Sequence, residues 1–132
     1  MALASLIIAT TALAGNPEIQ VWRDADLNVW QAHYGKPTKI ENGYQYYWNV
    51  SRFEVEASFL KSGKLANFNI EARKGNQPLT FTEAKALADK LGFGPYHLDD
   101  GDPAWGDPTA QSATAFFQDA SFHFEAVHED EE

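Results

Sequence analysis

Two glutamates are the residues best placed for chemistry in this sequence. Glu54 and Glu71 lie on neighbouring runs of alternating apolar and polar residues, and a turn at Ser62–Gly63 sets their carboxyl groups directly opposite each other. Close like charges raise one pKa, which is how paired carboxylates divide general-acid and general-base work. Arg52 and Arg73 stand diagonally from the pair and are expected to neutralise it. We therefore interpret the pair as part of a charge checkerboard on a solvated sheet face and predict no catalytic residue.

The same strand face is the main candidate binding surface. It is acidic and rich in amides, and one exposed tyrosine lies on it; the side chains predicted to share it are Gln45, Tyr47, Glu54, Glu56, Asn67, Asn69 and Glu71. A surface of one charge sign favours a partner of the opposite sign. We expect a basic protein to bind there, with the predicted contacts Tyr47, Glu54, Glu56, Asn69 and Glu71.

Trp105 is a second candidate anchor. It lies among aspartates in a segment expected to be a loop, and large aromatic side chains with a polar edge dominate interface energetics. The alternative is that Trp105 folds back as a lid over the open end of the core.

The other candidate metal and catalytic sites lack the residue spacing that their motifs require. Asp99, Asp100 and Asp102, with Asp107 downstream, resemble a calcium loop, but the EF-hand spacing is not met and no glutamate closes the loop. His123 and Glu125 share one strand face without a third ligand in view. There is no nucleophile elbow and no phosphate-binding glycine loop. We predict no metal and no cofactor.

Composition narrows the class further. The chain has 132 residues, 19 acidic and 10 basic side chains, a formal charge of -9 and no cysteine. This balance argues against nonspecific binding to nucleic acid or anionic membranes. The lack of cysteine excludes disulfides, cysteine-ligated metal sites and cysteine nucleophiles.

The first segment is typical of an export signal. Residues 1–14 are uncharged and end in the small-x-small pattern Ala12–Leu13–Ala14, so the mature chain is expected to start at Gly15, in the periplasm or secreted. The run is too short for a membrane span, and no positive charge precedes Arg23, as a leader would normally have. The alternative is a buried apolar helix of the fold.

Two helices are predicted. The first begins near Asp24 and ends at Tyr34, because Gly35 and Pro37 stop it. Ile19 and Val21, before it, indicate a short strand or an extended lead-in. The second helix begins with the capping box of Thr80 and Glu83 and ends at Gly92.

Three alternating runs lie between the helices: 45–49, 52–60 and 65–73. In the second hairpin, Phe53, Val55, Ala57 and Phe59 oppose Ala72, Ile70, Phe68 and Ala66, and Lys61 opposes Lys64. A turn at Val50–Ser51 would place Trp48 opposite Phe53, Tyr46 opposite Val55 and Tyr44 opposite Ala57. Residues 94–108 are expected to be a long loop, and 113–117 and 122–127 to be strands.

These elements predict an α+β fold, a two-layer sandwich in which helices pack on one face of an antiparallel β-meander. We expect a single domain over residues 15–127 and an acidic tail over 128–132, and find no sequence repeat.

Residues from the first helix through the meander carry a resemblance. A helix stop at Gly35–Lys36–Pro37 is followed by the aromatic strand 44–48 and by the strand, glycine turn and lysine of 59–65. This stretch is similar to small exported domains grouped with outer-membrane assembly lipoproteins of the SmpA/OmlA kind and with the β-lactamase inhibitor protein. Those domains place two helices before the sheet, and they carry disulfides or an anchoring cysteine that this chain lacks. The resemblance implies a noncatalytic protein-binding role in the cell envelope and transfers no site residue.

Three functional hypotheses result. The first is an exported protein-binding module, an inhibitor or immunity protein against a basic toxin or hydrolase. The second is a small glutamate-dependent hydrolase or carbohydrate-binding protein of the envelope. The third is a purely structural envelope component. The sequence does not decide the oligomeric state.

Overall fold

The computed structural model describes residues 19–94, 96–106 and 113–126. The proposed leader, the acidic tail and Asp107 lie outside these residues. The described elements are α2 (Leu27–Tyr34), β1 (Lys39–Glu41), β2 (Gln45–Val50), β3 (Phe53–Phe59), β4 (Leu65–Ala72), α3 (Phe81–Lys90), β5 (Tyr96–Asp99), β6 (Asp102–Gly106), β7 (Ala113–Gln118) and β8 (Ser121–Ala126).

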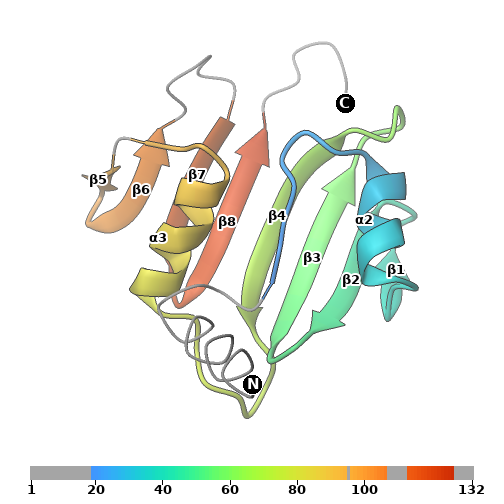
Figure 1. Ribbon diagram of the computed structural model, residues 1–132, viewed down its shortest axis with the longest axis horizontal. Helices are drawn as coiled ribbons and strands as arrows, with labels where there is room; N and C mark the ends of the chain where they lie inside the picture. The colour runs from blue at the N-terminus through green and yellow to red at the C-terminus, as the bar shows by residue number, and fades with distance from the viewer. Residues whose placement is uncertain (1–18, 95, 107–112, 127–132) are drawn as a thin grey trace, which may run out of the picture.

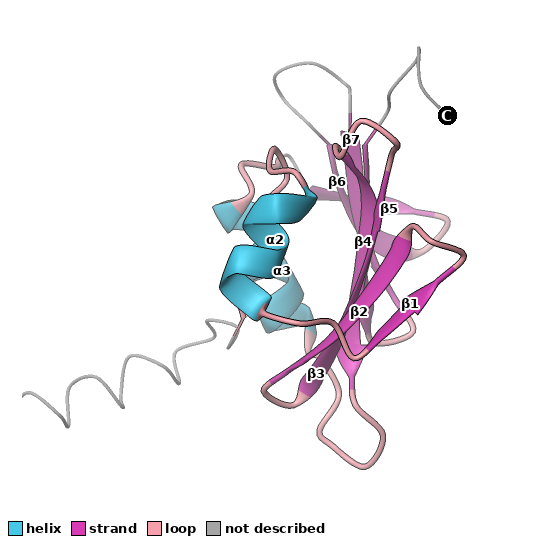
Figure 2. Ribbon diagram, turned by 90° about the vertical axis from the view of Figure 1, so that its right-hand side faces the viewer, coloured by secondary structure: helices cyan, strands magenta, loops and turns pink. Residues whose placement is uncertain are grey.

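The predicted α+β class is confirmed. The described residues form one eight-stranded antiparallel sheet in the order β1-β2-β3-β4-β8-β7-β6-β5, and both helices pack on the same face of it (Figure 1 and Figure 2). Neither described helix is long and apolar enough to span a membrane. Among the described elements, no helix covers the other face of the sheet.

The topology contains a repeat that the sequence does not show. A helix followed by an antiparallel meander of four strands occurs as α2 with β1–β4 and again as α3 with β5–β8 (Figure 1). The two units join through their last strands, where Phe68 of β4 lies opposite Phe124 of β8 and Ile70 lies opposite Phe122. The sheet and its core are therefore continuous from one unit to the other.

The core lies between the sheet and the helices. Alternation buries one side of each central strand, and the largest fully buried side chains are Trp30, Trp48, Phe53, Phe68, Phe122, Phe124, Ile70, Leu87 and Val55. Trp30 of α2 packs edge-on against Phe59 and is stacked at 6.1 Å on Trp48. Aromatic pairs at such distances add to area burial, which suits a chain without disulfides.

Both helices end as the sequence predicts, but the first begins later. Asp26, rather than Asp24, caps α2 by accepting a hydrogen bond from the Val29 N–H. Gly35 follows with φ 85°, the region that favours glycine. In α3 the predicted capping box is present, since Thr80 and Glu83 satisfy each other's backbone N–H groups. Ile19 lies in no strand, although its side chain is buried in the core.

The hairpin register is confirmed over most of its length. Phe53 to Ser58 lie opposite Ala72 to Asn67 as predicted, but a bulge after Ser58 then sets Phe59 opposite Leu65. The predicted pairs Phe59–Ala66 and Lys61–Lys64 are therefore wrong. The loop is longer than the two-residue turn assumed, and its extra residue is absorbed by the bulge.

The predicted β2–β3 register is wrong by two residues. Trp48 lies opposite Val55 and Tyr46 opposite Ala57, because the turn is Ser51–Arg52 and Ser51 adopts φ 59°. A shift of two residues leaves every side chain on its predicted face, since strand side chains alternate with period two.

The expected loop over 94–108 is also wrong. Strands β5 and β6 form a hairpin whose turn is Asp100–Gly101, with φ 55° and 90°. Asp-Gly is a preferred pair for such a turn, so the sequence does contain this signal. Strand β1 is a further element that the sequence analysis does not predict, although Asn42–Gly43 marks the turn that follows it.

Candidate functional site

The sheet face opposite the helices carries most of the predicted binding residues. We call it the acidic face; from the register, it is formed across β1–β4 and β8 by Lys39, Glu41, Gln45, Tyr47, Glu54, Glu56, Asn67, Asn69, Glu71, His123 and Glu125. Period-two alternation brings together the five sheet residues proposed for binding, Tyr47, Glu54, Glu56, Asn69 and Glu71. Strand β8 and strand β1 add residues that local pairing of β2–β4 could not include.

A continuous cross-strand row runs through the middle of the acidic face. From β1 to β7 the directly opposed residues are Lys39, Tyr47, Glu56, Asn69, His123 and Phe116. Directly opposed side chains on one face have Cβ atoms about 5 Å apart. A partner lying across the strands would therefore meet acidic, amide and aromatic groups in succession.

At one end of this row, Tyr47 is held by β1. Its hydroxyl donates to Glu41 at 2.7 Å, and the Lys39 ammonium lies 4.3 Å from the ring centroid and 3.4 Å from the Glu41 carboxylate. The hydrogen bond to Glu41, with burial second, raises the pKa of the Tyr47 hydroxyl, so this group remains a donor at neutral pH. The ring is half-buried rather than exposed, contrary to the prediction.

Glu56 lies in the middle of the acidic face. Burial raises the pKa of its carboxyl; the hydrogen bond from Gln45 Nε2, 3.0 Å long, opposes that shift, and the charges of Glu54, Glu41 and Glu71 add to it. Lys39 pairs with Glu41, but the described residues show no ion pair to Glu54, Glu56 or Glu71, so these like charges make the free face electrostatically unfavourable. A cation placed over Glu56 would relieve this repulsion.

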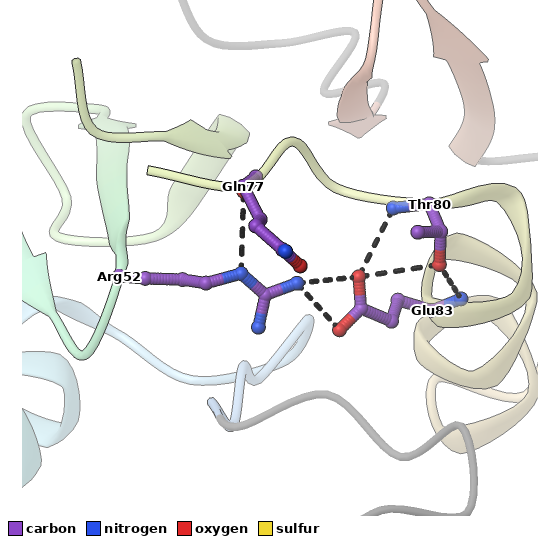
Figure 3. A network of polar contacts seen from close by, with 4 residues as sticks. All are labelled: Arg52, Gln77, Thr80 and Glu83. Carbon is purple, nitrogen blue, oxygen red and sulfur yellow. Dashed lines mark hydrogen bonds and ion pairs between the residues drawn. The ribbon is translucent and has the colours of Figure 1, made fainter. Parts of the chain in front are cut away.

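The Glu54–Glu71 pair is directly opposed as predicted, but its expected neutralisation is wrong. Arg52 lies in the turn before β3, and its guanidinium is directed to Glu83 of α3 and to the Gln77 carbonyl (Figure 3). Arg73 donates to the Ser51 carbonyl. Glu71 instead accepts a hydrogen bond of 3.1 Å from Ser121 of β8.

His123 and Glu125 lie on the acidic face, as their alternation predicts. The His123 ring stacks on Phe116 with centroids 4.6 Å apart. Burial lowers the pKa of His123, although the charges of Glu71 and Asp119 partly offset that shift, so the ring is neutral at neutral pH.

The neutral state follows because loss of hydration around the half-buried ring outweighs the attraction of those two carboxylates. The pair shows no third ligand; within the described ranges, no group of three or more histidine or acidic side chains could hold a metal ion.

Trp105 does not lie in a loop, so that prediction is corrected. It belongs to β6, is 2% exposed, and stacks on Phe81 of α3 with centroids 6.2 Å apart. Trp105 and its cross-strand partner Ala115 are both buried, so their side chains face the core. A side chain so buried is not available as a surface anchor; it is buried, as the alternative interpretation expected, but as part of strand β6 and not as a lid over the core.

A hollow of about 770 Å³ adjoins one end of the acidic face. It shares Gln45 and Asn67 with the acidic face and is also lined by Ser58, by Tyr44, which is 48% exposed, and by Lys61. The hollow lies at the end of β3, where the register with β4 shifts after Ser58. It is large enough to receive a bulky side chain of a partner.

Glu41, Lys39 and Phe116 are the residues of this region that the sequence analysis does not identify. The first two belong to β1, which the Asn42–Gly43 turn could have revealed. The position of Phe116 beside His123 depends on the pairing of β7 with β8.

Comparison with known proteins adds little to these observations. No protein-family model matches the chain, and no curated protein matches it in sequence. The structure is similar to that of a cysteine-rich secretory protein from Staphylococcus aureus, with a TM-score of 0.45 and 14% sequence identity over 84% of this chain and 48% of that one. The chain thus spans about half the length of that protein. The resemblance to envelope lipoproteins and the β-lactamase inhibitor protein stays a prediction.

Proposed function

We propose that this chain is an exported, noncatalytic protein-binding module, an inhibitor or immunity protein whose acidic face binds a basic partner. The observation that carries the proposal is the charge of that face. Among the residues that define it, one lysine accompanies five glutamates: Glu41, Glu54, Glu56, Glu71 and Glu125. Electrostatic complementarity speeds encounter with a basic partner and selects against acidic ones.

The packing of the molecule supports this use of the face. Both helices cover the opposite side of the sheet (Figure 2), so the acidic face is not needed to enclose the core. Tyr47 and the adjoining hollow beside Tyr44 offer aromatic contacts next to the glutamates. Interfaces commonly combine a buried aromatic anchor with a polar surround. Export is proposed from the uncharged residues 1–14 and their small-x-small ending.

The test is capture of a partner from an envelope fraction by the immobilised chain, followed by binding measurements with the purified partner. The variant Glu54→Gln/Glu71→Gln is expected to weaken binding at least about tenfold, and its affinity should depend less on salt. Asp24→Asn/Asp89→Asn is the matched control, because it removes the same charge from exposed positions outside the acidic face. Equal weakening by both variants would show that only net charge matters and would reject the assignment of this surface.

A hydrolase or carbohydrate-binding protein is the second candidate. The observation in its favour is the direct opposition of Glu54 and Glu71 on the acidic face, which also carries Tyr47. Here the single variants Glu54→Gln and Glu71→Gln would each abolish turnover of a polysaccharide, whereas a protein-binding module would show no turnover to lose. A panel of envelope polysaccharides assayed with the unaltered chain separates the two.

A further inference from the structure

Among the described residues, strand β5 forms one edge of the sheet. It is last in the strand order, and all four of its residues are exposed. Opposed residues of an antiparallel pair exchange either both backbone hydrogen bonds or neither. Pro103, opposite Leu98, has no N–H, so Leu98 does not exchange bonds with β6. The N–H and C=O groups of Leu98, and by alternation those of Tyr96, therefore point away from β6.

Apolar side chains gather beside these outward backbone groups. Leu98 is 63% exposed, Tyr96 48% and Phe81 of α3 39%. The rings of Phe81 and Tyr96 are 5.7 Å apart, and both lie within 6.2 Å of the Trp105 ring. Within the part of the chain that the structure describes, the buried core thus continues to this edge of the sheet as an exposed apolar strip.

The opposite edge of the sheet is protected differently. In β1 the apolar Ile40 stands between Lys39 and Glu41, which form an ion pair of 3.4 Å. Charged residues, lysine above all, keep edge strands from pairing with other chains. Strand β5 contains no lysine and no proline, and its only full charge is Asp99 beside the turn.

An extended strand is the kind of partner that fits this edge, because its backbone can pair with the outward N–H and C=O groups of Tyr96 and Leu98. We propose that it is β5 of a second copy of this chain, antiparallel to the first. The sequence Tyr96–His97–Leu98 is apolar, polar, apolar, and is therefore self-complementary about His97. In that register Tyr96 lies opposite Leu98 of the second copy, and both outward-pointing residues exchange backbone hydrogen bonds.

This symmetric pairing has two structural consequences. Tyr96 and Leu98 of both copies cover one another on the helix side, next to Phe81, and remove the apolar strip from water. A two-fold axis perpendicular to the sheet keeps the faces aligned, so the acidic faces of both copies lie on the same side of one continuous sheet. The dimer does not depend on the proposed function, but it would present two acidic faces to a partner.

The oligomeric state tests the proposal. The full chain is expected to show a concentration-dependent monomer–dimer equilibrium in sedimentation velocity. Leu98→Lys is expected to raise the dimer dissociation constant at least about tenfold, because it places a charge on the edge. Ile40→Lys is the matched control: it makes the same kind of change at an exposed residue of the opposite edge and should leave the equilibrium unchanged. A chain that stays monomeric up to millimolar concentration overturns the proposal, as does a dimer that Ile40→Lys dissociates.

Single cysteines test the register, since the chain has none of its own. His97→Cys places the two thiols opposite each other at a non-hydrogen-bonded pair, where Cβ atoms lie about 5 Å apart, and mild oxidation should give a disulfide-linked dimer. Leu98→Cys faces Tyr96 of the second copy and should form little. Cross-linking by Leu98→Cys but not by His97→Cys overturns the proposed register, and cross-linking by Ile40→Cys alone overturns the choice of edge.

Discussion

The side chain of Arg52 joins the two topological units of the sheet through Glu83. Arg52 lies in the turn between β2 and β3, and its Nη2 is 2.8 and 2.7 Å from the two carboxylate oxygens of Glu83 in the first turn of α3 (Figure 3). The same carboxylate accepts hydrogen bonds from the N–H and hydroxyl of Thr80, which caps that helix. An ion pair therefore couples the first unit to the start of the second.

Loss of this ion pair should cost stability. The two side chains are only 21% and 13% exposed, so Arg52→Ala leaves a charged, largely buried carboxylate without its cation. We expect the free energy of unfolding to fall by about 1–3 kcal/mol, measured by urea denaturation. Lys85→Ala, which removes an exposed ion pair to Asp89, should cost less than about 0.5 kcal/mol. Equal losses in the two variants would contradict the importance given to the Arg52 contact.

The free energy of unfolding should also depend on pH because of Glu83. Burial alone would raise the pKa of the Glu83 carboxyl, but the hydrogen bonds from Arg52 and Thr80 outweigh it and hold the pKa below its usual value. As the pH falls, the Glu83 carboxyl therefore takes up its proton in the unfolded chain before it does so in the folded one. The stability that ionised Glu83 gives to the fold is present above a pH of about 4.3 and is lost as the pH falls through the lower pKa of the folded state. Unfolding curves between neutral and acid pH should show a smaller loss for Glu83→Gln than for the unaltered chain.

Glu56→Gln should make the protein more stable and a weaker binder. Burial and the charges of Glu54, Glu41 and Glu71 raise the pKa of Glu56, so its ionised form at neutral pH disfavours the folded state. This loss of folding free energy is present at a pH above the pKa of Glu56 in the folded state, and it is absent below the pKa of Glu56 in the unfolded state. A gain of less than about 1 kcal/mol at neutral pH is expected because solvent screens this half-exposed group. Denaturation and partner binding would be measured together, and a gain at acid pH alone would refute the sign.

Two buried tryptophans should respond differently to the same substitution. Trp48 Nε1 donates to the Gly35 carbonyl at 2.9 Å, whereas Trp30 Nε1 is buried without a hydrogen-bond partner among the described residues. Trp48→Phe removes a satisfied donor, and Trp30→Phe removes an unsatisfied one, with the same change in volume. The first should cost about 1–2 kcal/mol more in the free energy of unfolding. A larger loss for Trp30→Phe would mean that packing around its ring dominates.

The β3–β4 hairpin shows how much of the strand register can be predicted from local sequence patterns. Alternation alone places Phe53 opposite Ala72 and Glu54 opposite Glu71, because one register separates apolar from polar residues on both strands. Alternation cannot detect the shift of two residues between β2 and β3, because such a shift leaves every side chain on the same face of the sheet. It cannot detect the bulge after Ser58 either, because the pairing up to Ser58 is unchanged by it. Alternation does not reveal the Asp100–Gly101 hairpin either, because the surrounding prolines and aspartates indicate a loop equally well.

The sequence by itself determined the capping box of α3, the glycine stop of α2, the alternation of β2–β4 and β8, and therefore that Glu54, Glu56 and Glu71 share a face. These features depend on neighbours within a few residues or on a period of two. Only the tertiary structure decided that β8 lies beside β4, that Trp105 is buried, that Arg52 pairs with Glu83 and that β5 forms an edge of the described sheet. Each of these depends on contacts between segments far apart in the chain, whose free energy is gained only when the whole sheet assembles.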